Sequence, residues 1–125
     1  MKVKNKTILV TGGGSGMGRE LVLHLLAKGA RVITVDINEN ALHETAAFAG
    51  SQKESLSTFV VDITNKDAVE ELLRKALEQH GHVDGIINNA GIIQPFVHVS
   101  NLAFESIERV MNINFYGTLY ITKTF

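Results

Sequence analysis

The chain has no cysteine and a single proline, Pro95, among its 125 residues. The absence of cysteine excludes a disulfide scaffold and thiol catalysis, and fits the reducing cytoplasm where we expect this protein. Twelve basic residues face 13 acidic ones, so no charge excess indicates nucleic-acid or membrane binding. The N-terminal lysines are followed only by the short apolar run 8–10, so we expect no signal peptide, and no run approaches a membrane span. The length allows one domain, over residues 1–125.

Glycine is plentiful in one place, the loop from Thr11 to Gly18. An apolar run, 7–10, precedes this loop and an amphipathic segment, 19–28, follows it. In that setting glycines let the backbone turn tightly and approach a ligand, and the first N–H groups of the next helix attract an anion. The pattern therefore predicts phosphate binding, with a purely structural turn as the alternative.

The spacing of this loop narrows the class of site. Gly12, Gly16 and Gly18 form G-x3-G-x-G, and Met17 breaks the alternative pattern G-x-G-x-x-G. Arg19-Glu20 stands where a P-loop needs lysine and serine or threonine, so a P-loop is excluded.

Strand-like and helical patterns alternate four times along the chain. The expected strands are 7–10, 31–36, 56–61 and 83–87, and the expected helices are 17–28, 38–48, 64–80 and 101–125. Thr64 is the expected N-terminal cap of the third helix. The alternation predicts an α/β fold, a doubly wound parallel sheet in three αβα layers, cut after about four strands.

Four polar or flexible features fall at the carboxyl ends of these strands, where such sheets bind ligands. They are the glycine loop, Asp36, Asp62 and the turn 88–91. Asp36 lies 18 positions after Gly18, where a carboxylate binds the adenosine ribose of NAD. Ser15 and Ile37 offer no cation for a 2′-phosphate, so we expect NAD rather than NADP.

Each of these residues also has a structural interpretation. Asp36 could be a solvated aspartate at a strand end. Asp62 could face an adenine amino group or begin a turn with Thr64, and the residues leave both readings open. Asn88-Asn89 is compatible with ordinary turn chemistry.

Taken together, these motifs resemble the short-chain dehydrogenase/reductase family. They are Thr11-Gly12-x3-Gly16-x-Gly18, Asp36, Asp62-Ile63, Asn88-Asn89-Ala90-Gly91 and Asn114-x2-Gly117. The resemblance implies a Rossmann-type fold, a bound nicotinamide dinucleotide, and hydride exchange with a small alcohol or ketone. The cofactor-binding residues would be Gly12, Gly14, Ser15, Gly16, Met17, Gly18, Asp36, Ile37, Asp62, Ile63, Asn89, Ala90 and Gly91. Asn114 would hold a water in the proton relay.

The family's catalytic serine and Tyr-x-x-x-Lys pair are absent from these 125 residues. Lys123 follows Tyr120 by three positions, and Tyr116 is followed four positions later by Tyr120, so neither tyrosine fits the motif. We therefore expect no turnover from this chain alone. It is either the cofactor-binding half of a longer dehydrogenase or a catalytically silent dinucleotide-binding or interaction module.

Two further expectations concern metals and assembly. His80 and His82 have no third ligand nearby in sequence, so we expect no metal site. The last helix carries the apolar residues Phe115, Leu119, Ile121 and Phe125, and the sheet would have an unpaired edge. In the resembling family this helix packs against a partner subunit, so we expect a homo-oligomer.

Overall fold

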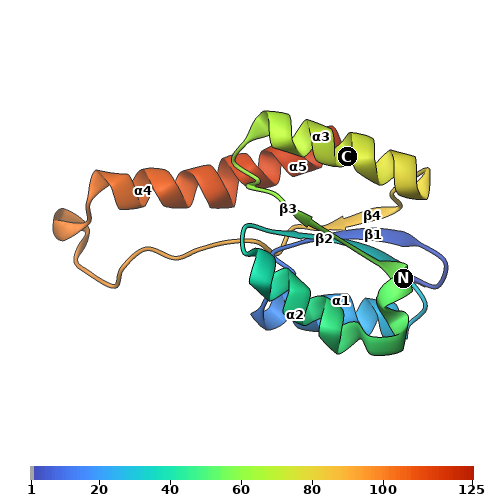
Figure 1. Cartoon of the computed structure of the whole chain (residues 1–125). Helices are drawn as coiled ribbons and strands as arrows, with labels where there is room; N and C mark the ends of the chain where they lie inside the picture. The colour runs from blue at the N-terminus through green and yellow to red at the C-terminus, as the bar shows by residue number, and fades with distance from the viewer. Residues whose placement is uncertain (1) are drawn as a thin grey trace.

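The computed structural model describes residues 2–125, in which four parallel strands form one sheet (Figure 1). The strands are β1 (Thr7–Thr11), β2 (Arg31–Asp36), β3 (Leu56–Val60) and β4 (Gly85–Ile87). Their order in the sheet is β3-β2-β1-β4, so the chain crosses from one side of β1 to the other between β3 and β4. This arrangement confirms the predicted parallel α/β fold. The predicted domain starts at residue 1, which lies outside the described residues.

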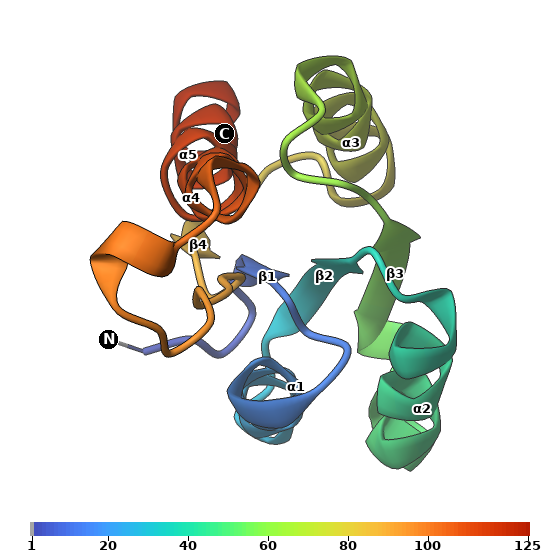
Figure 2. The ribbon, with the colours of Figure 1, turned by 90° about the vertical axis from the view of Figure 1, so that its left-hand side faces the viewer.

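Helices cover both faces of the sheet. The α-helices are α1 (Gly16–Ala27), α2 (Glu39–Ala49), α3 (Lys66–His80), α4 (Phe104–Val110) and α5 (Thr118–Thr124). Shorter helical segments are η1 (Gly50–Ser55), η2 (Val99–Asn101) and the π-helical η3 (Met111–Gly117), which joins α4 to α5. Figure 2 shows α1 and α2 on one face and α3, α4 and α5 on the other, which gives the three αβα layers.

Two apolar cores follow from this layering. β1 is buried along its whole length, and alternate side chains point to opposite faces, so Leu9 joins one core and Ile8 the other. Leu9 packs in the cluster that includes Leu72 of α3 and Ile121 of α5. Ile8 packs in the cluster that includes Val22 of α1. A parallel strand covered on both faces has a continuous apolar run, as residues 8–10 of β1 do.

The start of α3 differs from the sequence prediction. Asn65, not Thr64, is the N-cap, because its side-chain oxygen accepts a hydrogen bond from Ala68 N at 3.1 Å. Thr64 is occupied elsewhere: its hydroxyl donates to Asp62 Oδ1 at 2.7 Å. The turn between Asp62 and Thr64 therefore delays the helix by one residue.

Some predicted apolar positions also lie elsewhere than expected. Met17 has the helical spacing of the apolar positions Leu21 and Leu25, which predicts that it is buried with them, but it is 79% exposed in the first turn of α1. Ile121, expected on an exposed apolar end, is fully buried, and Phe125 packs partly against the same core. Phe115 and Leu119 remain exposed on η3 and α5.

Candidate functional site

A cleft of about 750 Å³ opens where the carboxyl ends of the strands meet the following loops. Its volume falls in the range of small-molecule and cofactor sites. The residues singled out from the sequence that line it are Gly12, Ser15, Met17, Gly18, Asp36, Ile37, Asp62, Ile63, Asn89, Ala90 and Gly91. Gly14, Gly16 and Asn114, which were also singled out, do not line the cleft themselves.

The glycine loop has a shape that side chains would block. Gly12 has a φ of +71°, in the left-handed region that favours glycine. A Cβ on Gly18 would collide with the carbonyl oxygen of Gly12 and lie 2.6 Å from Asn89 Nδ2. Gly18 thus lets α1 begin directly against the end of β1, which brings the first turn of the helix to the cleft.

The N-terminus of α1 is left without a side-chain cap, unlike those of the next two helices. Asn38 caps α2 and Asn65 caps α3, whereas Ser15 makes no capping hydrogen bond and the first turn of α1 holds no acidic residue. The first N–H groups of a helix have no intrahelical partner and carry the positive end of its dipole. With Ser15 and Met17 lining the cleft, this end of α1 is available to an anion.

Asp36 is held in place at the end of β2 rather than freely solvated. Its Oδ2 accepts a hydrogen bond from Gly14 N at 3.0 Å, and its Oδ1 accepts one from Asn38 N at 3.1 Å. A carboxylate has about four acceptor sites, so each oxygen keeps a free one. The side chain is therefore oriented by the backbone and can still accept hydrogen bonds from a ligand.

Asp62 forms a turn with Thr64, which is one of the two roles that the sequence left open for it. Its Oδ1 accepts from Thr64 N at 2.9 Å and from the Thr64 hydroxyl at 2.7 Å. The same residue lines the cleft, next to Ile63. The turn does not exclude a ligand contact, because it uses one of the two carboxylate oxygens.

The loops after β1 and β4 are joined at the point where the strand order reverses. The hydroxyl of Thr11 accepts hydrogen bonds from Asn89 N at 3.1 Å and Ala90 N at 3.0 Å. The Asn89 amide donates back to Thr11 O at 3.1 Å and Gly12 O at 3.3 Å. The sequence did not assign this role to Thr11, whose only signal was its place before the glycines. Asn88 instead donates to the Thr122 hydroxyl of α5 at 3.0 Å.

Asn114 lies in the π-helical segment and binds the loop after β4. Its Oδ1 accepts from Ile92 N at 2.9 Å, and its Nδ2 donates to Ile92 O at 2.7 Å. π-helical turns inside α-helices occur frequently at functional sites. This pair holds the loop that borders the cleft at Gly91 and Ile92.

The sequence analysis did not predict one wall of the cleft. Glu105, Glu108 and Arg109 of α4, with Asn112 and Ile113 of η3, line it opposite the strand ends. No motif marks these residues, and their place depends on the direction in which α4 and η3 leave the sheet (Figure 1).

Neither tyrosine takes part in the cleft. Tyr116 and Tyr120 lie with ring centroids 6.2 Å apart on η3 and α5, and neither lines the cleft. Residues 2–125 contain no group of three or more histidine, cysteine or acidic side chains placed to hold a metal. In the same residues no helix is long and apolar enough to cross a membrane.

The chain is similar to known proteins along nearly its whole length. It matches the family described as short chain dehydrogenase over residues 6–125. Short-chain dehydrogenase reductase 3b of Arabidopsis thaliana is 34% identical over 122 residues, which are 98% of this chain and 47% of that protein. The chain thus spans about half the length of the curated relatives it matches.

Solved structures give the same result. A xylitol dehydrogenase with NAD+ bound matches with a TM-score of 0.93 and 28% identity, over 99% of this chain and 48% of that one. ElxO with NADP bound matches with a TM-score of 0.90 and 25% identity, over 96% of this chain and 48% of that one. The fold is thus the Rossmann-type fold of these oxidoreductases. With its family match over residues 6–125, the chain belongs to the short-chain dehydrogenase family.

Proposed function

We propose that this chain forms the NAD-binding half of an oxidoreductase that exchanges hydride with a secondary alcohol or ketone. Family membership supports the reaction class, and the xylitol dehydrogenase and ElxO structures hold NAD+ and NADP in proteins of the same fold. Xylitol is an alcohol, which fits the proposed class of substrate.

The residues of the cleft fit a dinucleotide. The loop from Gly12 to Gly18 and the uncapped N-terminus of α1 would hold the pyrophosphate, through backbone N–H groups. Gly14 has no room for a side chain, because a Cβ there would lie 2.7 Å from Asp36 Oδ2. Asp62 and Ile63 would flank the adenine, and residues 89–91 would lie beside the nicotinamide half.

The choice of NAD over NADP rests on a single observation, the anchored carboxylate of Asp36. Its free acceptor sites suit the two hydroxyls of an adenosine ribose, and its charge repels a 2′-phosphate. Neither Ser15 nor Ile37 beside it carries a cation.

The remaining roles concern orientation of the reacting groups. NAD, when bound, supplies the carbon that accepts or donates the hydride. Asn114 would fix the loop at Ile92 and, with the spare acceptor and donor of its amide, hold a water of the proton relay. The acid/base serine, tyrosine and lysine of the family are not among these 125 residues, so the chain alone should show no turnover.

Calorimetric titration of the full-length protein with NAD and with NADP tests this proposal. NAD should bind the more tightly, and Asp36→Asn should weaken NAD binding about tenfold, as expected for loss of hydrogen bonds to a charged acceptor. Asp67→Asn, an exposed carboxylate in the first turn of α3, serves as the control and should leave NAD affinity unchanged.

The outcomes separate the possible functions. Equal or tighter binding of NADP by the wild type would contradict the assignment of NAD. Tight NAD binding without oxidation of any alcohol by the full-length protein would indicate a silent binding module instead of an enzyme.

A further inference from the structure

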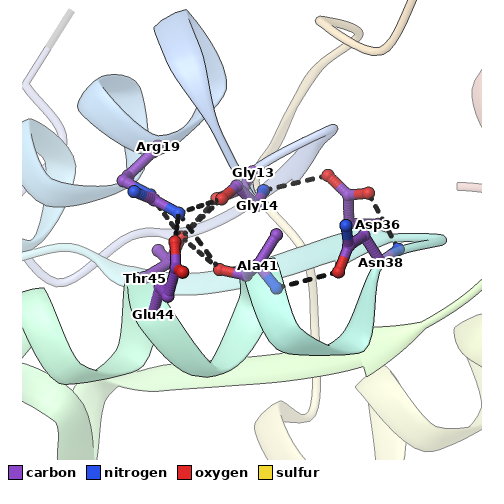
Figure 3. A network of polar contacts seen from close by, with 8 residues as sticks. All are labelled: Gly13, Gly14, Arg19, Asp36, Asn38, Ala41, Glu44 and Thr45. Carbon is purple, nitrogen blue, oxygen red and sulfur yellow. Dashed lines mark hydrogen bonds and ion pairs between the residues drawn. The ribbon is translucent and has the colours of Figure 1, made fainter.

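Arg19 connects the glycine loop to the neighbouring helix. It lies in the first turn of α1, and its side chain, only 18% exposed, extends to α2 (Figure 3). Its guanidinium donates to the carbonyl oxygen of Gly14, to Thr45 Oγ1 at 3.1 Å and to Glu44 Oε2 at 2.8 Å. The Phe48 ring lies 5.2 Å from the guanidinium carbon. A single cation is thus held by groups from two elements far apart in the sequence.

Thr45 completes the connection from the α2 side. Its hydroxyl is fully buried and lies 2.8 Å from Gly13 O and 3.1 Å from Ala41 O, while it accepts from Arg19. A hydroxyl has one proton to donate, so these carbonyls compete for it, and the guanidinium supplies the donor that Gly14 O needs. Arg19 and Thr45 together therefore satisfy the two carbonyls at the middle of the glycine loop.

Gly14 is hydrogen-bonded to both Arg19 and Asp36. Gly14 accepts from Arg19 through its oxygen and donates from its nitrogen to Asp36 Oδ2 at 3.0 Å. Figure 3 shows this chain of contacts running from Arg19 through Gly14 to Asp36. The Gly14 N–H lies in the same peptide plane as the Gly13 carbonyl, which is 2.8 Å from Thr45 Oγ1, and the Gly14 carbonyl that Arg19 holds belongs to the next plane. Gly14, between the two planes, has no side chain to restrict their relative rotation. Arg19 therefore acts on this N–H in two ways: it restricts rotation about Gly14 from the carbonyl side, and it donates to Thr45, whose hydroxyl contacts the plane that carries the N–H.

We propose that Arg19 is a positioning residue for the adenosine side of the dinucleotide, acting through Gly14 on the Asp36 carboxylate. This inference rests on the proposed function. A bidentate planar donor suits the task, because a guanidinium can hold Gly14 O and Thr45 at once, whereas a lysine ammonium acts as a point charge. A side chain that only joined α1 to α2 would stabilise the fold without affecting how Asp36 binds a ligand.

A double-mutant cycle on the full-length protein distinguishes these two roles. NAD affinity is measured by calorimetry for the wild type, Arg19→Met, Asp36→Asn and the double variant. Arg19→Met should weaken NAD binding roughly tenfold in the wild type and less than about threefold when Asp36 is already asparagine, because residues in one network couple. Arg19→Lys should recover part of the loss. Additive effects of Arg19→Met and Asp36→Asn would overturn the inference.

Two further variants keep the test decisive. Arg74→Met removes another paired arginine, an exposed one on α3 with Glu71 and Glu78, and should leave NAD affinity unchanged. If Arg19→Met does not fold, Thr45→Val removes the second half of the connection, with Thr45→Ser as its conservative partner. Thr45→Val should show the same coupling to Asp36, and Thr45→Ser should bind NAD like the wild type. Absence of NAD binding by the wild type would refute the proposed function, whereas NAD binding that Arg19→Met and Thr45→Val leave unchanged would refute only this inference.

Discussion

Gly16 and Gly18 are two positions apart and are required for different physical reasons. Gly18 faces protein: a Cβ there would meet the Gly12 carbonyl and the Asn89 amide. Gly16 faces open space, since a Cβ would have no atom within 4 Å, but its φ of +52° is strained for any other residue. One glycine thus permits close packing, and the other permits an unusual backbone angle beside the cleft.

Substitution of Gly16 by alanine should therefore cost about 1 kcal/mol of folding stability through strain alone. Gly81→Ala is the matched control, because Gly81 also has a positive φ, +76°, and open surroundings, but lies at the end of α3. Urea denaturation should give similar losses for the two variants, whereas calorimetry should show weaker NAD binding for Gly16→Ala only. A loss of NAD affinity in both variants would contradict a local role for Gly16.

At the scale of elements, α3 has a defined structure at each end. Asn65 caps its N-terminus, and Gly81 follows its C-terminus in the left-handed region. His80, in the last turn, is hydrogen-bonded to the Ser57 hydroxyl of β3, with 3.0 Å between Nε2 and Oγ. The helix is thus tied to the strand it covers by a polar contact as well as by the apolar core.

The cap of α3 gives a direct test of the helix start. Asn65→Ala should lower the free energy of unfolding by ~1 kcal/mol, because it removes the acceptor of the Ala68 N–H. Thr64→Ala should cost less, since the Thr64 hydroxyl bonds Asp62 and not the helix. Chemical denaturation gives the free energy of unfolding of both variants. A larger decrease for Thr64→Ala than for Asn65→Ala would indicate that Thr64 is the N-cap.

His80 should make stability depend on pH. Partial burial, with a smaller contribution from the charge of Arg31, lowers the pKa of His80 below its ordinary value. The folded state thus favours neutral His80, so its stabilising contribution is complete above the unfolded pKa of about 6.5 and is lost as pH falls through the lower folded pKa. Urea unfolding can be measured from about pH 8 to about pH 5, a range that includes the ordinary histidine pKa. Over this range the free energy of unfolding should fall less for His80→Gln than for the wild type.

His43→Gln provides the control for that experiment, because His43 is exposed on α2. It should follow the wild-type dependence on pH. An identical pH dependence for His80→Gln and the wild type would show that His80 does not titrate differently in the folded state.

Across the whole molecule, exposed apolar side chains lie along α4, η3 and α5, of which α4 extends away from the sheet in Figure 1. These side chains are Phe104, Ile107, Met111, Phe115, Tyr116 and Leu119. Exposed apolar patches of this extent mark interaction surfaces in soluble proteins. In addition, β4 has a single neighbour, β1, within residues 2–125. Both features favour the association predicted from the sequence.

Substitution of Phe115, which is 53% exposed on this surface, tests whether the surface mediates association. The wild type should sediment as a dimer or larger species at high concentration, and Phe115→Glu should shift it toward the monomer, because a buried charge in an apolar interface is costly. Leu77→Glu, at an exposed apolar position on α3, should leave the association state unchanged. A wild type that stays monomeric at high concentration would refute the prediction.

Local patterns were sufficient to predict the four strands and the first three α-helices, whereas the list of cofactor-binding residues came from the resemblance to the family. Asp36 and the glycine loop were found because a strand, a turn and a helix are each visible within a few residues. The wall formed by Glu105, Glu108 and Arg109 was missed, because these side chains read as the solvated face of a helix. The cap at Asn65 was misplaced by one residue, since Thr64 and Asn65 are both good caps and only the Asp62 contact distinguishes them.

The alternation of strands and helices, the glycine loop and the carboxylate after the second strand could be predicted from the sequence, because each depends on residues close together in the chain. The strand order, the pairing of Thr11 with Asn89 and the connection from Arg19 to Thr45 became visible only in the folded chain. Those contacts join residues 78 and 26 positions apart. They arise only when the sheet is assembled and its helices are packed, so no local periodicity or spacing records them.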